Sequence, residues 1–547
     1  MWRFDCCLRN VINFIVMKIR DIGLFISRRR KALGVNQKEL AVLCGVSEHA
    51  LCNLERGIGN PTLRLVTAVA EALGLELNLR AKDMEILKMT CSSTIIESLA
   101  ERRRFGMRPG LETIRALCAA LGDPQTKFPA IHVAGTNGKG AVCALLSSAL
   151  LATSRGDRPL TNGGDRPQLV GDRPHPIGLY TSPHLVRLAE RFVLNGVPIS
   201  DDKLEHFAKT VHNAISKWGL SPSKSGGQAP VALGGQALEE VTFFEALTAM
   251  AFLAFADAKV DRAILECGLG GRLDATNICQ PELCVITRIG LDHCDWLGDT
   301  VEKIAAEKAG IIKPGVPIVL GCNDEIVRAV ISSRAKEVGA PFFYAPDLAD
   351  ETEIPPNLSL RGAFNRENAV TALAALRVLS ESGRIAAPDP SMCFSGAVWP
   401  GRFQRVGGFL VDGAHNPPAA TALAAALAEE FPGLRLPLVA GFCGDKDVDA
   451  VLRTLAPHVS CGFAVRTNNP RSLSAEETAS LMRGAGIAAE PCESLAEALR
   501  KASSTATAPV LVCGSLFLAG EALVELGACP RCAAGRADPS ELLVGSV

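Results

Sequence analysis

The stretch Ile131-His-Val-Ala-Gly-Thr-Asn-Gly-Lys-Gly-Ala141 organises this chain of 547 residues. Its apolar start, residues 131–134, predicts a short buried strand, and the apolar residues 142–151 predict a helix. A glycine-rich turn, residues 135–140, lies between them. Such a turn lets backbone N–H groups approach phosphate oxygens, and the helix N-terminus adds partial positive charge. The stretch therefore predicts a phosphate-binding loop in which Lys139 supplies a full charge.

The spacing of this turn departs from the general phosphate loop, G-x-x-x-x-G-K-[ST]. Only two residues separate Gly135 from the pair Gly138-Lys139, and Gly140 and Ala141 follow where a metal-binding hydroxyl would be expected. An ordinary strand, turn and helix is the alternative to a phosphate site. The polar motifs further along the chain favour the site.

Length and composition bound the class of protein. The length suggests roughly three domains, and 48% apolar with 21% charged residues is ordinary for a well-packed protein. The net charge of −1 indicates no class of partner. Residues 1–83, however, carry 13 Lys and Arg against 8 Asp and Glu, a net charge of +5 that leaves −6 for the remainder. Positive charge is thus concentrated at the N-terminus.

The 19 cysteines are scattered without regular spacing, so we expect free thiols in a reducing cytoplasm. Residues 11–17 form a short apolar run without a cleavage site after it. No apolar run reaches the roughly 18 residues of a membrane helix, and we expect no membrane partner. Cys529 and Cys532 would supply only half of a zinc site.

Residues 17–83 predict a small all-helical domain, and Met17 begins its first coherent segment. Asn36 and Ser47 are suited to cap two of its helices, and Gly34 and Gly45 interrupt the chain between helices. The predicted helices span residues 22–31, 37–44, 48–55 and 62–73.

Gln37-Lys-Glu-Leu-Ala, Gly45-Val-Ser and Leu54-Glu-Arg-Gly, in this order, resemble the Cro/CI-type helix-turn-helix family over about 60 residues. In that family the third helix enters the major groove of DNA. The alternative is a helical appendage that binds no DNA, because Glu48 and Glu55 are unfavourable near phosphates and operators usually need two such domains. The resemblance implies that the following residues face DNA: Gln37, Ser47, Glu48, His49 and Asn53.

Beyond a linker at residues 84–105, apolar strands alternate with helices, which predicts a parallel sheet covered on both faces. This central α/β domain is expected at residues 106–390. A proline- and glycine-broken linker at about residues 382–401 leads to a smaller α/β domain, residues 396–528. The strands expected in the two domains include residues 131–134, 263–266, 283–287 and 316–320, then 409–412, 436–442 and 510–513.

Three segments are not expected to pack in a core. Residues 153–177 contain Gly-Asp-Arg-Pro three times, and residues 221–237 are rich in Ser, Gly and Pro. Both are predicted surface loops. Residues 529–547 are a predicted disordered tail.

Polar residues follow several strands, at the edge where open α/β sheets bind ligands. Ser182 lies in a turn, Glu266 ends an apolar strand, and His293 follows the next strand. A hard cation beside phosphates takes few protein ligands and several waters. These three residues could form such a site without a hydroxyl after Lys139. Each also has a plain structural alternative, as a turn former, a helix cap or a loop residue.

Together the motifs after the linker resemble the folylpolyglutamate synthase/dihydrofolate synthase family, within the Mur ligase superfamily. The resemblance covers roughly residues 92–528. The matching strings, in family order, are FGMRPGLE, HVAGTNGKG, YTSPHL, TFFE, ECGLGGRLDATN, LDH, EKAGI, the Asn365/Asn368 stretch, PGRFQ, DGAHNP and VLVCGS.

The resemblance implies sites for ATP, metal and substrate. ATP would be bound by Gly135, Thr136, Asn137, Gly138, Lys139, Gly140, Ala141, Asn368, Arg402 and Asp412. Magnesium would be bound by Ser182, Glu266 and His293, and Lys308, once carbamylated, would help to place a second metal. Substrate contacts would come from Thr242, Phe243, Phe244, Glu245, Arg272, Asp274, His415 and Asn416, with Asp445-Lys-Asp447 on the glutamate side.

The implied chemistry is ATP-dependent amide formation by a monomeric ligase. The carboxylate of dihydropteroate or of a folate attacks the γ-phosphoryl group, and the amine of L-glutamate then attacks the acyl phosphate. Lys139 and magnesium would spread the developing charge. Lys308 and His415 are the other expected catalytic residues, His415 by orienting the amino acid.

Two other functions stay open. A cell-wall Mur ligase would need a UDP-binding domain before the phosphate loop, and the 28 residues between the linker and Ala134 are too few. A transcription regulator could use a ligase-like domain as a sensor. The intact Lys139, Glu266, His293 and Lys308 argue against such a dead site.

Overall fold

The computed structural model describes residues 26–56 except 28 and 32, and 63–73, 94–100, 102, 110–154, 176–219, 241–356, 358–505 and 508–528. The chain divides into two compact units, Met1–Lys82 and Asp83–Val547. Several predictions fall outside the described residues: most of the repeat at 153–177, the loop at 221–237, the tail at 529–547, and Cys529 with Cys532. Within the described part, no helix is long and apolar enough to cross a membrane.

The first unit contains the helix-turn-helix that the sequence predicts. Its helices include α2 (Gln37–Cys44), α3 (Glu48–Glu55) and α4 (Leu63–Ala72). The Asn36 side chain accepts from Glu39 N, and Ser47 accepts from Ala50 N, so both predicted caps are confirmed. Gly45 ends α2 in the left-handed conformation, with φ of 64°. A small core of its own holds the unit together, including Leu40, Leu51, Leu54 and Val69.

The central part of the second unit is built on an eight-stranded sheet in the order β4-β3-β2-β5-β1-β6-β7-β8. Strands β2, β5, β1, β6, β7 and β8 run parallel, whereas β3 and β4 form an antiparallel edge that the sequence did not predict. The strands are β1 (Ala130–Ala134), β2 (Ile177–Tyr180), β3 (Phe192–Leu194), β4 (Val197–Pro198), β5 (Arg262–Glu266), β6 (Pro281–Ile286), β7 (Ile318–Leu320) and β8 (Phe342–Tyr344).

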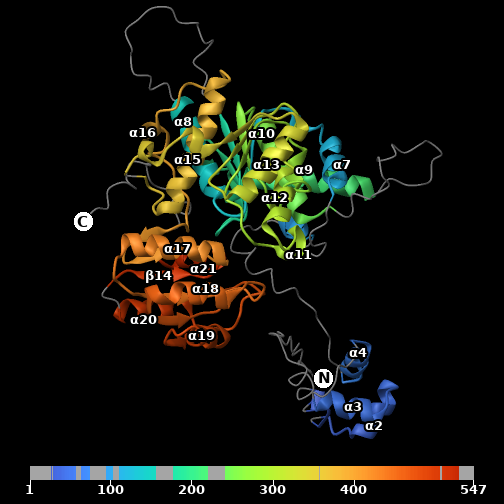
Figure 1. Ribbon diagram of the computed structural model, residues 1–547. Helices are drawn as coiled ribbons and strands as arrows, with labels where there is room; N and C mark the ends of the chain where they lie inside the picture. Colours follow the sequence, from blue (N-terminus) through green and yellow to red (C-terminus); the bar gives the residue numbers. More distant parts are fainter. Residues whose placement is uncertain are drawn as a thin grey trace, which may run out of the picture. The chain divides into compact units, whose positions relative to one another are not determined.

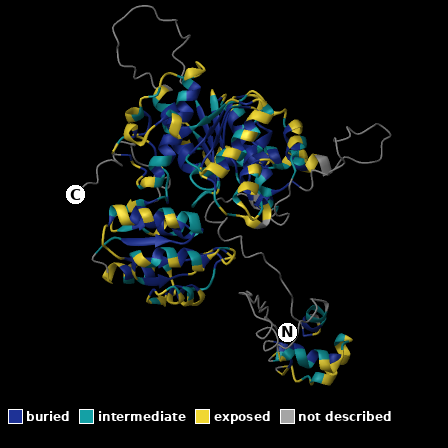
Figure 2. Cartoon of the chain, in the orientation of Figure 1, coloured by how far each residue is buried: buried dark blue, intermediate teal, exposed yellow. Residues whose placement is uncertain are grey.

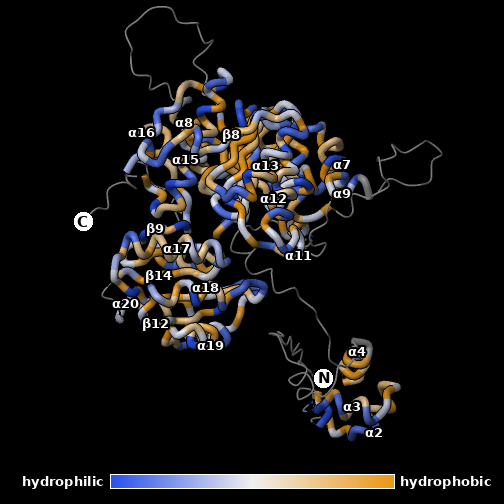
Figure 3. The backbone as a smooth tube through the Cα atoms, in the orientation of Figure 1, coloured by the Kyte–Doolittle hydropathy of each residue, from blue (hydrophilic) through white to orange (hydrophobic). Residues whose placement is uncertain are grey.

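Helices cover both faces of this sheet (Figure 1). Alternate residues of one strand point to opposite faces: Ile131 packs in the core with α8 and α15, whereas Ala130 packs in the core with α9 and α10. Figures 2 and 3 show the result, with buried, hydrophobic strands between helices whose outer faces are exposed and polar. The helices are α6 (Thr94–Ala100), α7 (Glu112–Ala120), α8 (Lys139–Ser154), α9 (Asp201–Gly219), α10 (Phe243–Asp257), α11 (Cys294–Leu297), α12 (Val301–Ala309), α13 (Glu325–Val338), α14 (Ala345–Leu348), α15 (Ala363–Glu381) and α16 (Pro390–Cys393).

A second sheet carries the C-terminal domain, in the order β13-β12-β11-β14-β10-β9, with only β9 antiparallel. Helices α17, α18 and α19 pack on one face, and α20 and α21 on the other. The elements are β9 (Gln404–Val406), β10 (Phe409–Val411), α17 (Pro417–Glu430), β11 (Leu436–Ala440), α18 (Val448–Leu455), β12 (Val459–Ala464), α19 (Ala475–Gly484), β13 (Ala489–Pro491), α20 (Leu495–Thr505), β14 (Val510–Cys513) and α21 (Leu516–Glu525).

The expected linker at residues 382–401 is wrong for much of its length. Cys393 and Phe394 are each 1% exposed and Ala397 is fully buried, all in the core that contains α8 and α15. The sequence of this segment is typical of a linker because it is rich in Pro, Gly and Ser, but several of its apolar residues pack in this core. Trp399, two residues before Gly401, also packs against this core.

Candidate active site

The phosphate-binding loop is the turn between β1 and α8, and neighbouring segments hold it closely. Gly138 has φ of 86°, and a Cβ there would collide with the Asn368 side chain from α15. Thr287 donates from Oγ1 to Asn137 O at 2.7 Å. Gly140 packs against the Trp399 ring. The glycines are therefore required by close approach as well as by conformation.

Two lysines meet at this loop. Lys139 donates from Nζ to Gly135 O at 3.1 Å and to Thr136 O at 3.2 Å. Lys308, on α12 and 3% exposed, donates to the same Gly135 O at 2.8 Å. Burial and the neighbouring Lys139 lower the pKa of Lys308 to about 7. Lys308 is thus placed beside the phosphate loop with a substantially neutral amine near pH 7.

The three predicted metal ligands line one cavity, together with Lys139. Glu266 is 4% exposed at the end of β5, and its Oε2 accepts from Ser182 N at 3.0 Å. Burial raises the pKa of Glu266, while Lys139 opposes that rise. A carboxylate buried at such a cost gains stabilisation from a cation bound beside it.

His293 follows β6 and has φ of 53°. Burial lowers the pKa of His293, so the neutral ring is available as a metal ligand at pH 7. The donor set of one carboxylate, one imidazole and one hydroxyl leaves positions for phosphate oxygens and water, as Mg²⁺ prefers. The residues present therefore fit a divalent cation.

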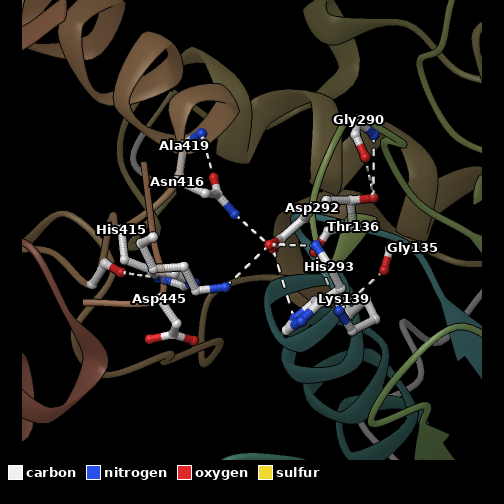
Figure 4. A network of polar contacts seen from close by, with 12 residues as sticks. Gly135, Thr136, Lys139, Gly290, Asp292, His293, His415, Asn416, Ala419 and Asp445 are labelled. Carbon is white, nitrogen blue, oxygen red and sulfur yellow. Dashed lines mark hydrogen bonds and ion pairs between the residues drawn. The ribbon is translucent and has the colours of Figure 1, made fainter. Parts of the chain in front are cut away.

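Asp292, next to His293 in the central domain, contacts two residues of the C-terminal domain (Figure 4). Its Oδ2 accepts from Asn416 Nδ2 at 2.9 Å, and its Oδ1 accepts from Lys446 Nζ at 3.1 Å. Burial alone would raise the pKa of Asp292, but His293 and Lys446 outweigh it and lower the pKa to about 2. Asp292 is therefore an anion at neutral pH.

The C-terminal domain contributes the other wall of the cavity. His415 lies with Nδ1 2.8 Å from Gly413 O. Because a carbonyl only accepts, Nδ1 carries the proton and Nε2 is the acceptor of the neutral ring. Asp412 accepts from Phe403 N at 2.7 Å and Ala414 N at 2.8 Å, so its carboxylate shapes the junction between the sheets.

The cavity has a volume of about 750 Å³, within the usual range for a ligand site. It brings together predicted residues from both domains: Thr136, Asn137, Gly138, Lys139, Gly140, Ala141, Ser182, Glu266, His293, Asn368, Arg402, Asp412, His415 and Asn416. Gly135 and Lys308 line a small adjoining pocket that also contains Asp292 and His293.

The predicted pterin contacts lie elsewhere. Thr242 caps α10, and Glu245 closes a capping box with it, accepting from Thr242 N at 2.8 Å. Asp274 accepts from Leu269 N and Thr276 N in a buried loop. Arg272 pairs with Glu307 at 2.8 Å. Phe244 packs against Gly268, and Phe243 contacts the core that contains α9 and α10. Their role toward a pterin stays a prediction.

The predicted DNA-facing residues lie on α3 and around it. Ser47, Glu48 and His49 are exposed, and Asn53 Nδ2 lies 3.3 Å from His49 Nδ1. Gln37 differs, because its Nε2 donates to Glu55 Oε2 at 2.8 Å and is engaged within the unit.

Sequence reasoning missed Asp292 and Trp399. The LDH motif contains Asp292, but its partners lie 124 and 154 positions further along the chain. Trp399 lies in the segment that was expected to be a linker. Only the folded chain brings these residues to the phosphate loop.

Comparison with known proteins agrees with this geometry. Residues 401–516 match the Mur ligase glutamate ligase domain, and residues 26–79 match the helix-turn-helix family. The dihydrofolate synthase/folylpolyglutamate synthase of Bacillus subtilis is 34% identical over 380 residues, covering 65% of this chain and 80% of the relative. The chain belongs to the folylpolyglutamate synthase/dihydrofolate synthase family.

Solved structures of folylpolyglutamate synthases share the fold. The Mycobacterium tuberculosis enzyme complexed with ADP and AMPPCP matches with a TM-score of 0.67 and 29% identity, covering 82% of this chain and 99% of that one. A bifunctional folylpolyglutamate synthase/dihydrofolate synthase with Mn, AMPPNP and L-glutamate bound matches with a TM-score of 0.63 and 28% identity, covering 80% and 99%. This chain is an ATP-dependent ligase of the folylpolyglutamate synthase/dihydrofolate synthase type with a helix-turn-helix unit before it.

Proposed function

We propose that this ligase adds L-glutamate to dihydropteroate, to a reduced folate, or to both, at the cost of ATP. One observation carries the proposal: a single cavity joins the phosphate loop and the Glu266 carboxylate to His415 and Lys446 of the C-terminal domain. Phosphoryl chemistry on one wall and an amino-acid site on the other is the arrangement that two-step amide formation needs.

The central domain would carry out the first step. The pterin-side carboxylate attacks the γ-phosphorus of ATP, the bond to the β,γ-bridging oxygen breaks, and ADP leaves. Lys139 swings from the loop carbonyls toward the phosphates, where its charge stabilises the transition state. Ser182, Glu266 and His293 would hold magnesium, which supplies further positive charge at the phosphates.

The C-terminal domain would carry out the second step. The neutral amine of glutamate attacks the acyl carbon, the C–O bond to phosphate breaks, and inorganic phosphate leaves with the amide formed. His415 presents Nε2 as an acceptor, which suits orienting the amine or receiving its proton. Lys446 and Arg471, which both line the cavity, are cations suited to the glutamate carboxylates.

A coupled ADP-release assay tests this proposal. It offers 7,8-dihydropteroate, tetrahydrofolate or a UDP-muramyl acceptor, each with L-glutamate. We expect glutamate-dependent ADP release with one or both pterins. Release with the UDP-muramyl acceptor alone would refute the assignment in favour of a cell-wall ligase.

We also propose that the first unit binds duplex DNA. An independent core holds α2 and α3 in helix-turn-helix order, and α3 exposes Glu48 and His49. Because phosphate contacts dominate such binding, retention should weaken steeply with salt. A fragment of residues 17–83 is passed over immobilised mixed duplexes at increasing salt. Absence of salt-dependent retention would leave the unit as an appendage.

A further inference from the structure

The carboxylate of Asp292 has both oxygens engaged by the C-terminal domain. Asn416 donates to Oδ2 and Lys446 donates to Oδ1, at 2.9 and 3.1 Å. The side chains of Asp292 and Lys446 are only 13% and 16% exposed. An ion pair so shielded from water is screened far less than a surface pair, so loss of one partner leaves a buried, unpaired charge.

Each end of this contact is rigidly mounted. On one side, Thr136 Oγ1 donates to Gly290 O and accepts from Gly290 N, both at 3.1 Å, which ties the loop carrying Asp292 to the phosphate loop. On the other side, Asn416 Oδ1 accepts from Ala419 N at 2.9 Å and caps α17. Its amide therefore points at Asp292 with its orientation already set (Figure 4).

The partners of Asp292 adjoin residues of the glutamate side. Asn416 directly follows His415, and Lys446 lies in the loop after β11 with Asp445, whose Oδ2 accepts from Arg471 Nη1 at 3.1 Å. Asp292 itself directly precedes His293. A movement of the C-terminal domain away from Asp292 would separate His415 and Lys446 from the phosphate loop.

A second contact between the domains provides a comparison. Arg361, just before α15, lies 3.6 Å from Glu430 at the end of α17, and the Arg361 side chain is 51% exposed. Neither residue lines the cavity. Exposed pairs of this kind contribute little to stability.

Apolar contacts also join the domains. Leu185 packs against the core that contains α20 and α21, and the ring centroids of Phe364 and Phe403 lie 6.4 Å apart. Because apolar contacts are non-directional, the buried polar contact at Asp292 is the one expected to fix the orientation of the glutamate side.

From these contacts, and on the basis of the function proposed above, we propose that Asp292 is a positioning residue for the glutamate-addition step. Through Asn416 and Lys446 it holds the C-terminal domain against the loop that carries His293, a contact that we call the latch. That same loop is hydrogen-bonded to the phosphate loop through Gly290 and Thr136. The latch places the glutamate amine in line with the acyl phosphate. It does not itself bind the nucleotide.

Two variants separate the latch from other roles. Asp292→Asn keeps the shape and the acceptor for Asn416 but leaves Lys446 without its counter-charge, and it removes the acceptor of His293 N, which Asn416→Ser leaves in place. Asn416→Ser keeps an N-cap for α17, since serine caps as well as asparagine, but its shorter side chain does not reach Asp292. Glu430→Gln is the matched control, because it removes an ion pair between the same two domains, together with the pair that Glu430 forms with Arg405 inside the C-terminal domain.

The kinetic measurement is steady-state turnover against glutamate, together with equilibrium binding of AMPPCP and magnesium without glutamate. We expect kcat/KM for glutamate to fall roughly 10-fold or more in each latch variant, within the range of coupled contacts, with AMPPCP affinity within about 2-fold of wild type. Because both variants break the same latch, the double variant should lose less than the product of the single losses. The proposal would be overturned if the kcat/KM loss of the double variant equalled the product of the two single losses. It would also be overturned if AMPPCP affinity fell as much as kcat/KM for glutamate.

Small-angle X-ray scattering of the full chain with AMPPCP and magnesium gives a reading that does not depend on catalysis. We expect a larger radius of gyration in Asp292→Asn and Asn416→Ser than in wild type and Glu430→Gln. An unchanged radius in the latch variants, or an equal increase in Glu430→Gln, would overturn the latch. If wild-type protein releases no ADP with any pterin, the proposed function fails, and the scattering result alone decides the latch.

Discussion

At the scale of single residues, this site depends on charges that are buried before any ligand arrives. Glu266 is 4% exposed and Lys308 is 3% exposed, and burial shifts the pKa of each toward its neutral form. Such groups are unfavourable in the folded chain by themselves. They become favourable once an oppositely charged or ligating partner occupies the cavity, which is typical of functional sites.

Substitution of Glu266 tests the metal site. Glu266→Gln keeps the shape and an acceptor for Ser182 N but removes the negative charge, so the site should hold magnesium more weakly. Loss of one preorganised electrostatic contact commonly costs on the order of 10²–10³ in rate. Turnover is measured against magnesium concentration. Thermal melting serves as the control, and the melting temperature should be equal or higher because a buried charge is gone. Wild-type turnover at limiting magnesium would show that Glu266 is not a ligand.

Substitution of Lys308 tests carbamylation. Carbamate forms when a neutral amine attacks carbon dioxide and loses a proton, and a pKa of about 7 makes that amine available. We predict a carbamate signal in ¹³C NMR of wild-type protein with ¹³C-bicarbonate. Lys308→Arg should lack it and lose activity on the order of 10²-fold, as expected for a missing electrostatic group.

Lys313→Arg provides the matched control for Lys308. Lys313 is also partly buried, and its Nζ donates to Asn277 Oδ1 at 2.7 Å rather than to the phosphate loop. It should keep the carbamate signal and most of the activity. A signal that survives in Lys308→Arg would assign the carbamate to another lysine.

At the scale of elements, the segment before the second sheet is part of the central core. Phe394 is 1% exposed, directly after α16, and packs with residues of α8 and α15. Helix α8 begins at Lys139, so this packing supports the helix that ends the phosphate loop. Trp399, further along the same segment, contacts Gly140 of that loop.

Phe394→Ala should therefore behave as a core truncation rather than as a linker change. We expect a loss of about 3–5 kcal/mol in the free energy of unfolding of the ligase part. Met392→Ala, on the neighbouring α16 and 37% exposed, should change it by less than about 0.5 kcal/mol. Both are measured by chemical denaturation. Equal stabilities for the two variants would restore the linker interpretation.

At the scale of the whole molecule, two units fold around separate cores. The first unit packs Leu40, Leu51, Leu54 and Val69 together, and the described residues that line the cavity all belong to the second unit. The three residues predicted for catalysis, Lys139, Lys308 and His415, lie in the second unit.

Deletion of residues 1–82 should leave turnover and the KM values for ATP and glutamate within about 2-fold of the full chain, because the described residues that line the cavity all belong to the second unit. The assay is pterin- and glutamate-dependent ADP release by both proteins. Addition of duplex DNA to the full chain is the companion measurement. A large loss of activity on deletion, with an unchanged melting temperature, would show that the first unit contributes to catalysis.

Short-range pattern in the sequence determined much of this protein. Strand β1, the glycine turn and α8 follow from the consecutive residues 131–151, and Asn36 and Ser47 cap their helices as predicted. The three predicted metal ligands do meet in one cavity, because each follows a parallel strand and such strands end at the same edge. Residues that are close in sequence, or that follow neighbouring strands of one parallel sheet, can therefore be placed near one another from the sequence pattern.

Contacts between distant segments depend instead on how the whole chain packs. Thr242 and Glu245, which match a substrate motif, form the capping box of α10. Phe394 reads as part of a linker but completes a core. Asp292 meets Asn416 and Lys446 across 124 and 154 residues. These pairings depend on which strands adjoin in each sheet and on how one sheet faces the other. Periodicity and spacing describe one element at a time, whereas a contact between domains is selected by the packing of all of them.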